Sequence, residues 1–311
     1  MPQLYKNINF PHRVTNIAYQ PNGNLFAVEN PNNNALSIYS LESGNSFSLE
    51  YQYDLCELPY AISAIDWAVI DGKDAIIAAT KMNFIKVIYD NKHYDIDIPT
   101  TSSITALKWA TSSAKFAVST AKGEVFIGHF SESKNLFSIK SFYTDEYILC
   151  LSWESTGSCI AIGTLNGYVK VYIATNKLAK SDSSHYGDKI GTFKCDSWVY
   201  NVSFMKNSLK IIAVDQSGSL SIFDLLDKDF KKYADNFSET PIIYISESKN
   251  GSFLVGNFEG FVYHVKFDNT LTIVRRSSTS ERSAEAVVLI SRVAGNTVVV
   301  QRSGKVGINF N

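Results

Sequence analysis

A short pattern recurs along the whole chain and limits the folds that this sequence can adopt. An apolar residue is followed three positions later by a second apolar residue, and two positions after that by an aromatic residue. Successive copies are 48, 42, 44, 51, 43 and 44 residues apart. A period of about 40–45 residues is typical of the four-stranded blades of a β-propeller. The seven copies therefore predict an all-β, seven-bladed β-propeller. The five full copies are Val14-Ile17-Tyr19, Ile62-Ile65-Trp67, Ile104-Leu107-Trp109, Ile148-Leu151-Trp153 and Val199-Val202-Phe204, and the two copies without an aromatic residue are Ile242-Ile245-Glu247 and Ala286-Leu289-Ser291.

Each copy continues in a way that predicts antiparallel strands joined by tight turns. A run of small and β-branched residues is followed by a turn and then by a segment in which apolar and polar residues alternate. Alternation with a period of two is the signal of a β-strand. Asn166-Gly167 is the clearest hairpin turn, because glycine adopts the positive φ that a two-residue turn requires. The corresponding turn glycines of other copies are Gly123, Gly218, Gly260 and Gly304.

The two ends of the chain are predicted to complete one blade together. The seventh copy, which runs from Ala286 to Asn311, has residues for three strands only. The segment Leu4–Phe10, which precedes the first copy, alternates and can supply the fourth strand. This pairing closes the ring and leaves no open sheet edge at the joint. We therefore expect residues 1–311 to form a single propeller domain.

The dipeptides that give WD repeats their name are missing, although the predicted fold is that of a WD-repeat propeller. Where Trp-Asp is usual, the strands end in Tyr39-Ser40, Tyr89-Asp90, Tyr172-Ile173 and Phe223-Asp224. The buried Trp–Ser–His–Asp network of regular repeats should thus be mostly absent, and aliphatic and aromatic packing should hold the blades together. The tryptophans are predicted to be structural core residues of the blades, and the alternative is an aromatic cage for a ligand. They are Trp67, Trp109, Trp153 and Trp198.

No segment carries a catalytic or cofactor-binding motif. The chain has no GxSxG, P-loop or HExxH sequence. Its histidines are far apart and have no partner at metal-ligand spacing. We therefore predict a protein that is not an enzyme and that holds no cofactor and no metal. A propeller can bring distant residues together around its channel, so an enzyme site centred there stays as an alternative. The histidines are His12, His93, His129, His185 and His264.

Charge, hydropathy and cysteine usage bound the partners and the compartment. The net charge of −1 gives no overall attraction for nucleic acid. No run approaches the roughly 18 apolar residues of a membrane helix, and the N-terminus lacks a secretory pattern. The four cysteines, Cys56, Cys150, Cys159 and Cys195, are scattered without CxxC spacing. They are expected to be buried apolar residues in a reducing compartment.

Three segments depart from the regular blade. Residues 176–197 are predicted to lengthen the link between blades four and five, and residues 225–240 to lengthen another link. Binding residues are often found on such loops, and a disordered insertion is the alternative. Residues 275–305 contain five arginines and one lysine against two glutamates, a net charge of +4. We hypothesise that Arg275, Arg276 and Arg282, in a polar loop between blades six and seven, receive an acidic peptide. The alternative is a solvated basic surface.

Several blocks of the sequence resemble one family, the WD-repeat subunit (subunit 1) of the actin-related protein 2/3 complex. The blocks occur in the order of the family and cover roughly residues 60–275. The match fades in the first and last blades. The family also carries a long insertion between blades six and seven, where this chain has only residues 275–285. The resembling blocks are Ile62–Ala68, Leu107–Trp109 followed by Lys115–Val118, Phe130–Asn135, Leu149–Trp153, Trp198–Phe204 and Asp268–Val274.

The resemblance implies a cytoplasmic, cytoskeletal scaffold without chemistry of its own, which helps to hold two actin-related proteins so that branched actin filaments can nucleate. The implied partners are the actin-related proteins, the other subunits of the complex and an acidic nucleation-promoting peptide, so the chain is expected to act in a hetero-oligomer. Nucleic-acid binding and membrane insertion are not expected. The alternative is an interaction propeller of another assembly, of the vesicle-coat or mitotic checkpoint (kinetochore) type.

Overall fold

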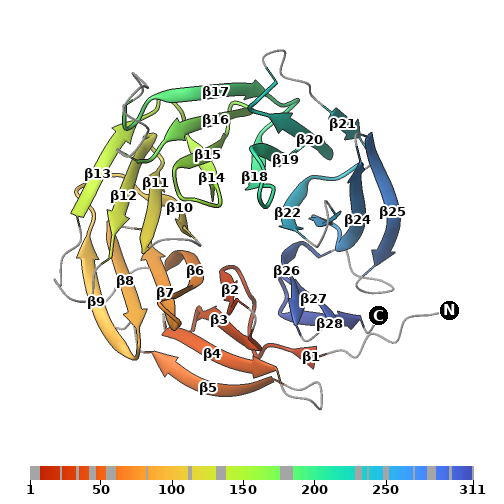
Figure 1. The fold of residues 1–311 in the computed structure, drawn as a ribbon. Coiled ribbons are helices and arrows are strands. Elements are labelled where there is room, and N and C mark those ends of the chain that lie inside the picture. Colours follow the sequence, from red (N-terminus) through yellow and green to blue (C-terminus); the bar gives the residue numbers. More distant parts are fainter. Residues whose placement is uncertain are drawn as a thin grey trace.

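Seven antiparallel sheets of four strands each are arranged as a ring, like the blades of a propeller (Figure 1). The predicted seven-bladed, all-β architecture is therefore confirmed. The computed structural model describes residues 8–21, 23–32, 35–41, 47–53, 61–81, 83–110, 114–130, 138–175, 185–227, 233–236, 238–247, 252–268, 270–278, 285–293 and 296–309. These residues contain no helix of the length and apolarity that crossing a bilayer requires.

Each blade is built from strands that follow one another in the chain, except the last. Blade one contains β2 (Ile17–Tyr19), β3 (Leu25–Asn30), β4 (Ala35–Leu41) and β5 (Phe47–Tyr53); blade two contains β6 (Ile62–Ile70), β7 (Lys73–Thr80), β8 (Phe84–Tyr89) and β9 (Lys92–Asp97). Blade three contains β10 (Ile104–Trp109), β11 (Lys115–Thr120), β12 (Glu124–His129) and β13 (Ser138–Tyr143); blade four contains β14 (Ile148–Trp153), β15 (Cys159–Thr164), β16 (Tyr168–Ile173) and β17 (Lys189–Lys194). Blade five contains β18 (Val199–Phe204), β19 (Lys210–Asp215), β20 (Ser219–Asp224) and β21 (Tyr233–Asn236); blade six contains β22 (Ile242–Glu247), β23 (Ser252–Asn257), β24 (Phe261–Asp268) and β25 (Thr270–Ser278).

Blade seven joins the two ends of the chain, as predicted. Its strands are β26 (Val287–Val293), β27 (Asn296–Gln301), β28 (Lys305–Asn309) and β1 (Ile8–Asn9). Antiparallel pairing sets Ile8 opposite Val306, so β1 lies beside β28 (Figure 1). The backbone N–H of Val14 then donates to the carbonyl of Arg302, 2.9 Å away, which ties blade one to blade seven. Residues 4–7 of the predicted strand lie outside the described residues.

The turn between the second and third strands uses the predicted glycines and a second device that the sequence analysis missed. All five predicted glycines have a positive φ, between 78° and 94°. In addition, the second strand of every blade ends in a polar residue, and several of these side chains accept hydrogen bonds from backbone N–H groups of the turn. A side chain at this position gives the N–H groups of the turn their hydrogen-bond acceptor. It thereby stabilises the turn in a protein that lacks most of the WD network. The polar residues at this position are Asn30, Thr80, Thr120, Thr164, Asp215, Asn257 and Gln301.

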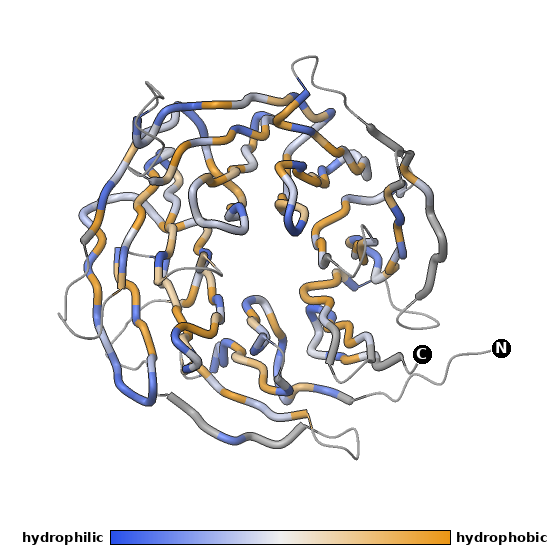
Figure 2. The backbone as a smooth tube through the Cα atoms, in the orientation of Figure 1, coloured by the Kyte–Doolittle hydropathy of each residue, from blue (hydrophilic) through white to orange (hydrophobic). Residues whose placement is uncertain are grey.

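Hydrophobic packing between neighbouring blades forms the core. The second strands are buried along nearly their whole length, and Figure 2 shows hydrophobic residues within the strands around the ring. The buried residues form seven clusters, and each cluster joins residues from two adjacent blades. Phe26 and Val298, for example, come from blades one and seven and are both fully buried. Burial of each such side chain contributes roughly 1.5–3 kcal/mol. The ring is therefore held together mainly by packing, as expected.

Polar contacts between first strands supplement this packing, which the sequence analysis did not anticipate. Asp66 of blade two accepts the backbone N–H of Trp109 in blade three at 2.7 Å. The indole N–H of Trp153 in blade four donates to the carbonyl of Lys108 at 3.0 Å. The backbone N–H of Phe204 in blade five donates to the hydroxyl of Ser152 at 3.0 Å. These hydrogen bonds have a defined direction, whereas hydrophobic packing has none. They therefore help to fix how neighbouring blades are aligned.

The outer strands correct the interpretation of the irregular segments. Strand β17 lies within residues 176–197, and β21 lies within residues 225–240. The extra residues therefore lengthen the connection between the third and fourth strands inside blades four and five, not a link between blades. Outer strands pair on one side only and carry many polar residues, so their alternation is weak. Residues 176–184 and 228–232 lie outside the described residues.

The buried thiols give a chemical test of the core. Burial raises the pKa of Cys150 to about 12 and that of Cys159 to about 11. At pH 8 the thiolate fraction of Cys150 should be about three orders of magnitude below that of a free cysteine. We expect both thiols to resist Ellman's reagent in the native protein and to react at once in denaturant. Peptide mapping after alkylation identifies the sites, and fast native labelling of Cys150 would contradict the packing between blades four and five.

Candidate functional site

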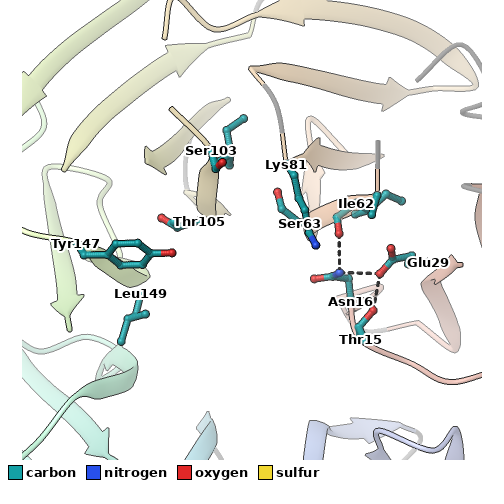
Figure 3. Close-up of a pocket in the computed structure, with 12 residues that line it drawn as sticks. Thr15, Asn16, Glu29, Ile62, Ser63, Lys81, Ser103, Thr105, Tyr147 and Leu149 are labelled. Atoms are coloured by element: carbon teal, nitrogen blue, oxygen red, sulfur yellow. Dashed lines mark hydrogen bonds between the residues drawn. The ribbon is translucent and has the colours of Figure 1, made fainter. Parts of the chain in front are cut away.

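One opening on the ring lies at the end where the first strands of the blades begin. We call it the entry mouth. It is a cavity of about 510 Å³ between blades one to four (Figure 3). Hydroxyl, amide and ammonium groups share its wall with apolar side chains, so it can bind both polar and apolar groups. The residues that line it are Thr15, Asn16, Glu29, Ala61, Ile62, Ser63, Lys81, Ser103, Ile104, Thr105, Tyr147 and Leu149.

A buried carboxylate anchors one side of the entry mouth. Glu29 accepts hydrogen bonds from the hydroxyl of Thr15 at 2.5 Å and from the amide of Asn16 at 2.7 Å. The same amide donates to the carbonyl of Ile62 at 2.9 Å, which joins blade one to blade two (Figure 3). Glu29 is thus engaged in holding the wall together and is poorly placed to act as an acid or base.

Three cations lie on adjacent blades at this end of the ring. Arg302 occupies the turn of blade seven, and its carbonyl accepts the N–H of Val14, which follows Arg13. Lys81 occupies the corresponding turn of blade two, and its N–H donates to the carbonyl of Ala61 at 3.1 Å. Figure 3 shows the ammonium group of Lys81 extending into the opening. We call Arg13, Lys81 and Arg302 the cationic arc.

Exposed aromatic side chains occupy blades four and five at the same end. Tyr147 precedes the first strand of blade four, and Trp198 precedes the first strand of blade five. The two positions correspond, because each carbonyl accepts a backbone N–H from the turn of its own blade. Tyr147 is 42% exposed and Trp198 is 44% exposed. We call Tyr147 and Trp198 the aromatic pair.

The exposure of Trp198 corrects its predicted role as a core residue. Trp67, Trp109 and Trp153 occupy the third position of the repeat pattern and are buried. Trp198 stands one residue ahead of the pattern, before the strand begins. The corresponding position in blade three is Ser103, whose carbonyl accepts the N–H of Ala121. The offset from the pattern could have shown this in the sequence.

The opposite end of the ring has a larger cavity of about 740 Å³, but its charged groups serve the fold. The ammonium of Lys108 lies 2.9 Å from the carboxylate of Asp66, between blades two and three. Burial lowers the pKa of Lys108, but the attraction of Asp66 outweighs this and holds the pKa above its ordinary value. Trp67, Trp109 and Trp153 also line this cavity. The paired charges bridge the blades and offer no free base.

The hypothesised arginine site lies elsewhere on the ring. Arg275 and Arg276 belong to the outer strand β25 of blade six, opposite His264 and Tyr263 of β24. They are therefore in a strand and not in the predicted loop. Arg282 lies outside the described residues. Among the residues that are described, no three His, Cys, Asp or Glu side chains gather closely enough to hold a metal ion.

One family model matches part of the chain. Residues 107–207, about a third of the sequence, match the model described as the anaphase-promoting complex subunit 4 WD40 domain. The match runs from the first strand of blade three to just beyond the first strand of blade five. It concerns the WD40 repeat and does not distinguish one WD-repeat assembly from another. No curated protein matches the chain.

Proposed function

We propose that this WD-repeat propeller is a non-catalytic scaffold subunit of the actin-related protein 2/3 complex, which supports nucleation of branched actin filaments by holding partners in place. The observation that carries the proposal is the ordered series of resembling blocks between residues 60 and 275, within a rigid ring of seven blades. The scaffold role is the general one for WD40 propellers, which assemble proteins and rarely catalyse. The proposed site of action is the cytoplasm and its cytoskeleton.

The partners of this proposal are the actin-related proteins, the other subunits and an acidic nucleation-promoting peptide. An acidic segment needs a basic surface. The chain offers two sets of cations for it: Arg275, Arg276 and Arg282, as hypothesised from the sequence, and the cationic arc.

A second candidate is a scaffold in a different assembly, of the coat or mitotic type. Residues 107–207 match a family model that is named after a subunit of one such assembly, the anaphase-promoting complex, but the match concerns the WD40 repeat and does not favour either candidate. The two candidates share the fold and the absence of chemistry, so only the partners separate them.

Affinity purification from the cells in which the chain is native tests both candidates. We expect the tagged full chain to co-purify with actin-related proteins and small helical subunits in stoichiometric amounts, because a scaffold is held by several interfaces at once. The control is the tag on an unrelated propeller of similar size. Coat or cell-cycle subunits in place of actin-related proteins would replace the first candidate by the second, and a chain that purifies alone would contradict both.

A further inference from the structure

The cations of the arc lack partners within the described part of the chain, and Lys81 is the member that lines the entry mouth. The side chains of Arg13, Lys81 and Arg302 make no ion pair or side-chain hydrogen bond there, and the Nε of Arg302 is buried without an acceptor. Glu29 is the carboxylate that lines the mouth, and its described hydrogen bonds come from Thr15 and Asn16. A buried guanidinium N–H without an acceptor costs free energy. The cationic arc is therefore complementary to an external carboxylate.

The backbone positions of the three cations lie on neighbouring blades although they are far apart in the sequence. Arg302 is bonded to Val14, the amide of Asn16 reaches Ile62, and Ala61 accepts the N–H of Lys81. This chain of contacts crosses blades seven, one and two without a gap. A single acidic segment could therefore meet all three cations at once.

Apolar surface faces the cationic arc across the same opening. Tyr147 lines the cavity together with Leu149, on the side opposite Lys81 (Figure 3). Trp198 extends this surface onto blade five, because Cys150 and Val199 of the two blades are in contact. The corresponding positions of blades two and three are Ala61 and Ser103, so the fold does not require an aromatic residue there. Large exposed aromatic side chains in adjacent positions are typical of binding surfaces.

Carboxylates beside the aromatic pair decide the orientation of the occupant. Asp145 and Asp196 are exposed and precede Tyr147 and Trp198 by two residues. They would repel an anion on this side of the mouth. A polyanion such as nucleic acid, which carries charge along its whole length, is therefore a poor match. An occupant with its negative charge at one end and apolar side chains at the other fits both sides.

We infer that the entry mouth binds a segment of a partner protein in which acidic residues lie next to an apolar residue. Its carboxylates pair with Arg13, Lys81 and Arg302, and its apolar side chain packs on Tyr147 and Trp198. This inference rests on the proposed function as a protein-binding scaffold, and it places an acidic partner at the channel and not on the outer strand of blade six.

A phage-displayed library of random dodecapeptides, selected on the purified full chain, tests the inference. We expect the selected peptides to combine Asp or Glu with an aromatic or large aliphatic residue. The double variant Arg13→Glu, Lys81→Glu should bind such a peptide at least ~10-fold more weakly, and more so at low salt, because attraction becomes repulsion. Trp198→Ala should weaken binding about 10-fold at any salt, because it removes an apolar contact.

Matched variants control for surface charge and for general loss of structure. Lys189→Glu on the exposed outer strand of blade four and Leu226→Ala, which is 74% exposed, should leave binding unchanged. Unchanged melting temperatures confirm folding of each variant. The inference is overturned if no peptide is enriched, if the enriched peptides lack acidic residues, or if the variant with Arg275, Arg276 and Arg282 changed to Glu loses binding while the entry-mouth variants keep it. If the peptide selection fails in this way, the scaffold proposal still stands on the co-purification result. If the chain purifies without partners, the scaffold proposal fails, but the peptide selection is not affected.

Discussion

Gly218→Ala should lower the free energy of unfolding by about 3 kcal/mol, whereas Gly72→Ala should lower it by only about 1 kcal/mol. Both glycines have a left-handed φ, +82° for Gly218 and +77° for Gly72. A Cβ on Gly218 would lie 1.8 Å from the carbonyl oxygen of Ser238, but a Cβ on Gly72 would meet nothing within 4 Å. Both variants therefore suffer the strain of a positive φ. Only in Gly218→Ala does the new Cβ also collide with the backbone of Ser238.

Urea unfolding of the two variants, followed by tryptophan fluorescence and circular dichroism, measures this difference. Gly72→Ala serves as the matched control, because its destabilisation comes only from the strain of a positive φ on alanine. The collision occurs where the turn of blade five meets the chain that enters blade six, so Gly218→Ala should disturb the joint between these blades. Equal destabilisation by the two substitutions would show that the close approach to Ser238 does not exist in solution.

Asp215→Asn should cost about 3 kcal/mol, although the two side chains have nearly the same shape. Asp215 is 1% exposed and caps the turn of blade five. Its Oδ1 accepts the N–H groups of Ser217 and Ser219 at 3.0 and 3.1 Å. Its Oδ2 accepts the N–H groups of Asp196 and Ser197 at 3.2 and 3.3 Å. An amide NH₂ in place of Oδ2 would face the N–H groups of Asp196 and Ser197. Neither these two groups nor the NH₂ would then have an acceptor.

The next blade supplies the control for this substitution. Asn257 caps the turn of blade six from the corresponding position, and its amide donates to the hydroxyls of Ser238 and Thr240 at 3.1 and 2.9 Å. The hydroxyl of Thr240 can reverse its role and donate to a carboxylate, and that of Ser238 can do so by giving up its bond to the carbonyl of Thr240. Asn257→Asp should therefore cost less, about 1 kcal/mol. The two variants are compared by the same urea titration. If Asn257→Asp proved the more damaging, the donors that surround each cap would not explain the choice of residue.

These two capping residues also show the limit of inference from the sequence. The spacing of the repeats predicted the turn between second and third strands in each blade, because glycine and local alternation act over a few residues. Whether the cap has to accept or to donate depends on the loop that arrives from the previous blade. That loop offers backbone N–H groups to Asp215 and hydroxyls to Asn257. The sequence marks both residues as polar and does not tell these environments apart.

The outer strands and Trp198 show the same limit in a different way. The first strands keep the repeated pattern of buried apolar residues, so they were located correctly. Strand β17 pairs only with β16, and just two of its six residues are buried. Its apolar pattern is therefore short and has polar residues at both ends. It was therefore taken for part of an insertion. Trp198 was assigned to the core because of its residue type, although it precedes the first strand of blade five and is exposed.

The sequence alone determined the number of blades, the turns and the closure of the ring, because these follow from local patterns repeated at a regular period. Only the tertiary structure decided the candidate site. Arg13, Lys81 and Arg302 share one arc because the ring brings blades seven, one and two together, and Tyr147 faces Lys81 across a cavity that blades one to four enclose. No periodicity encodes which turn residues meet, since that depends on how the ring closes on itself.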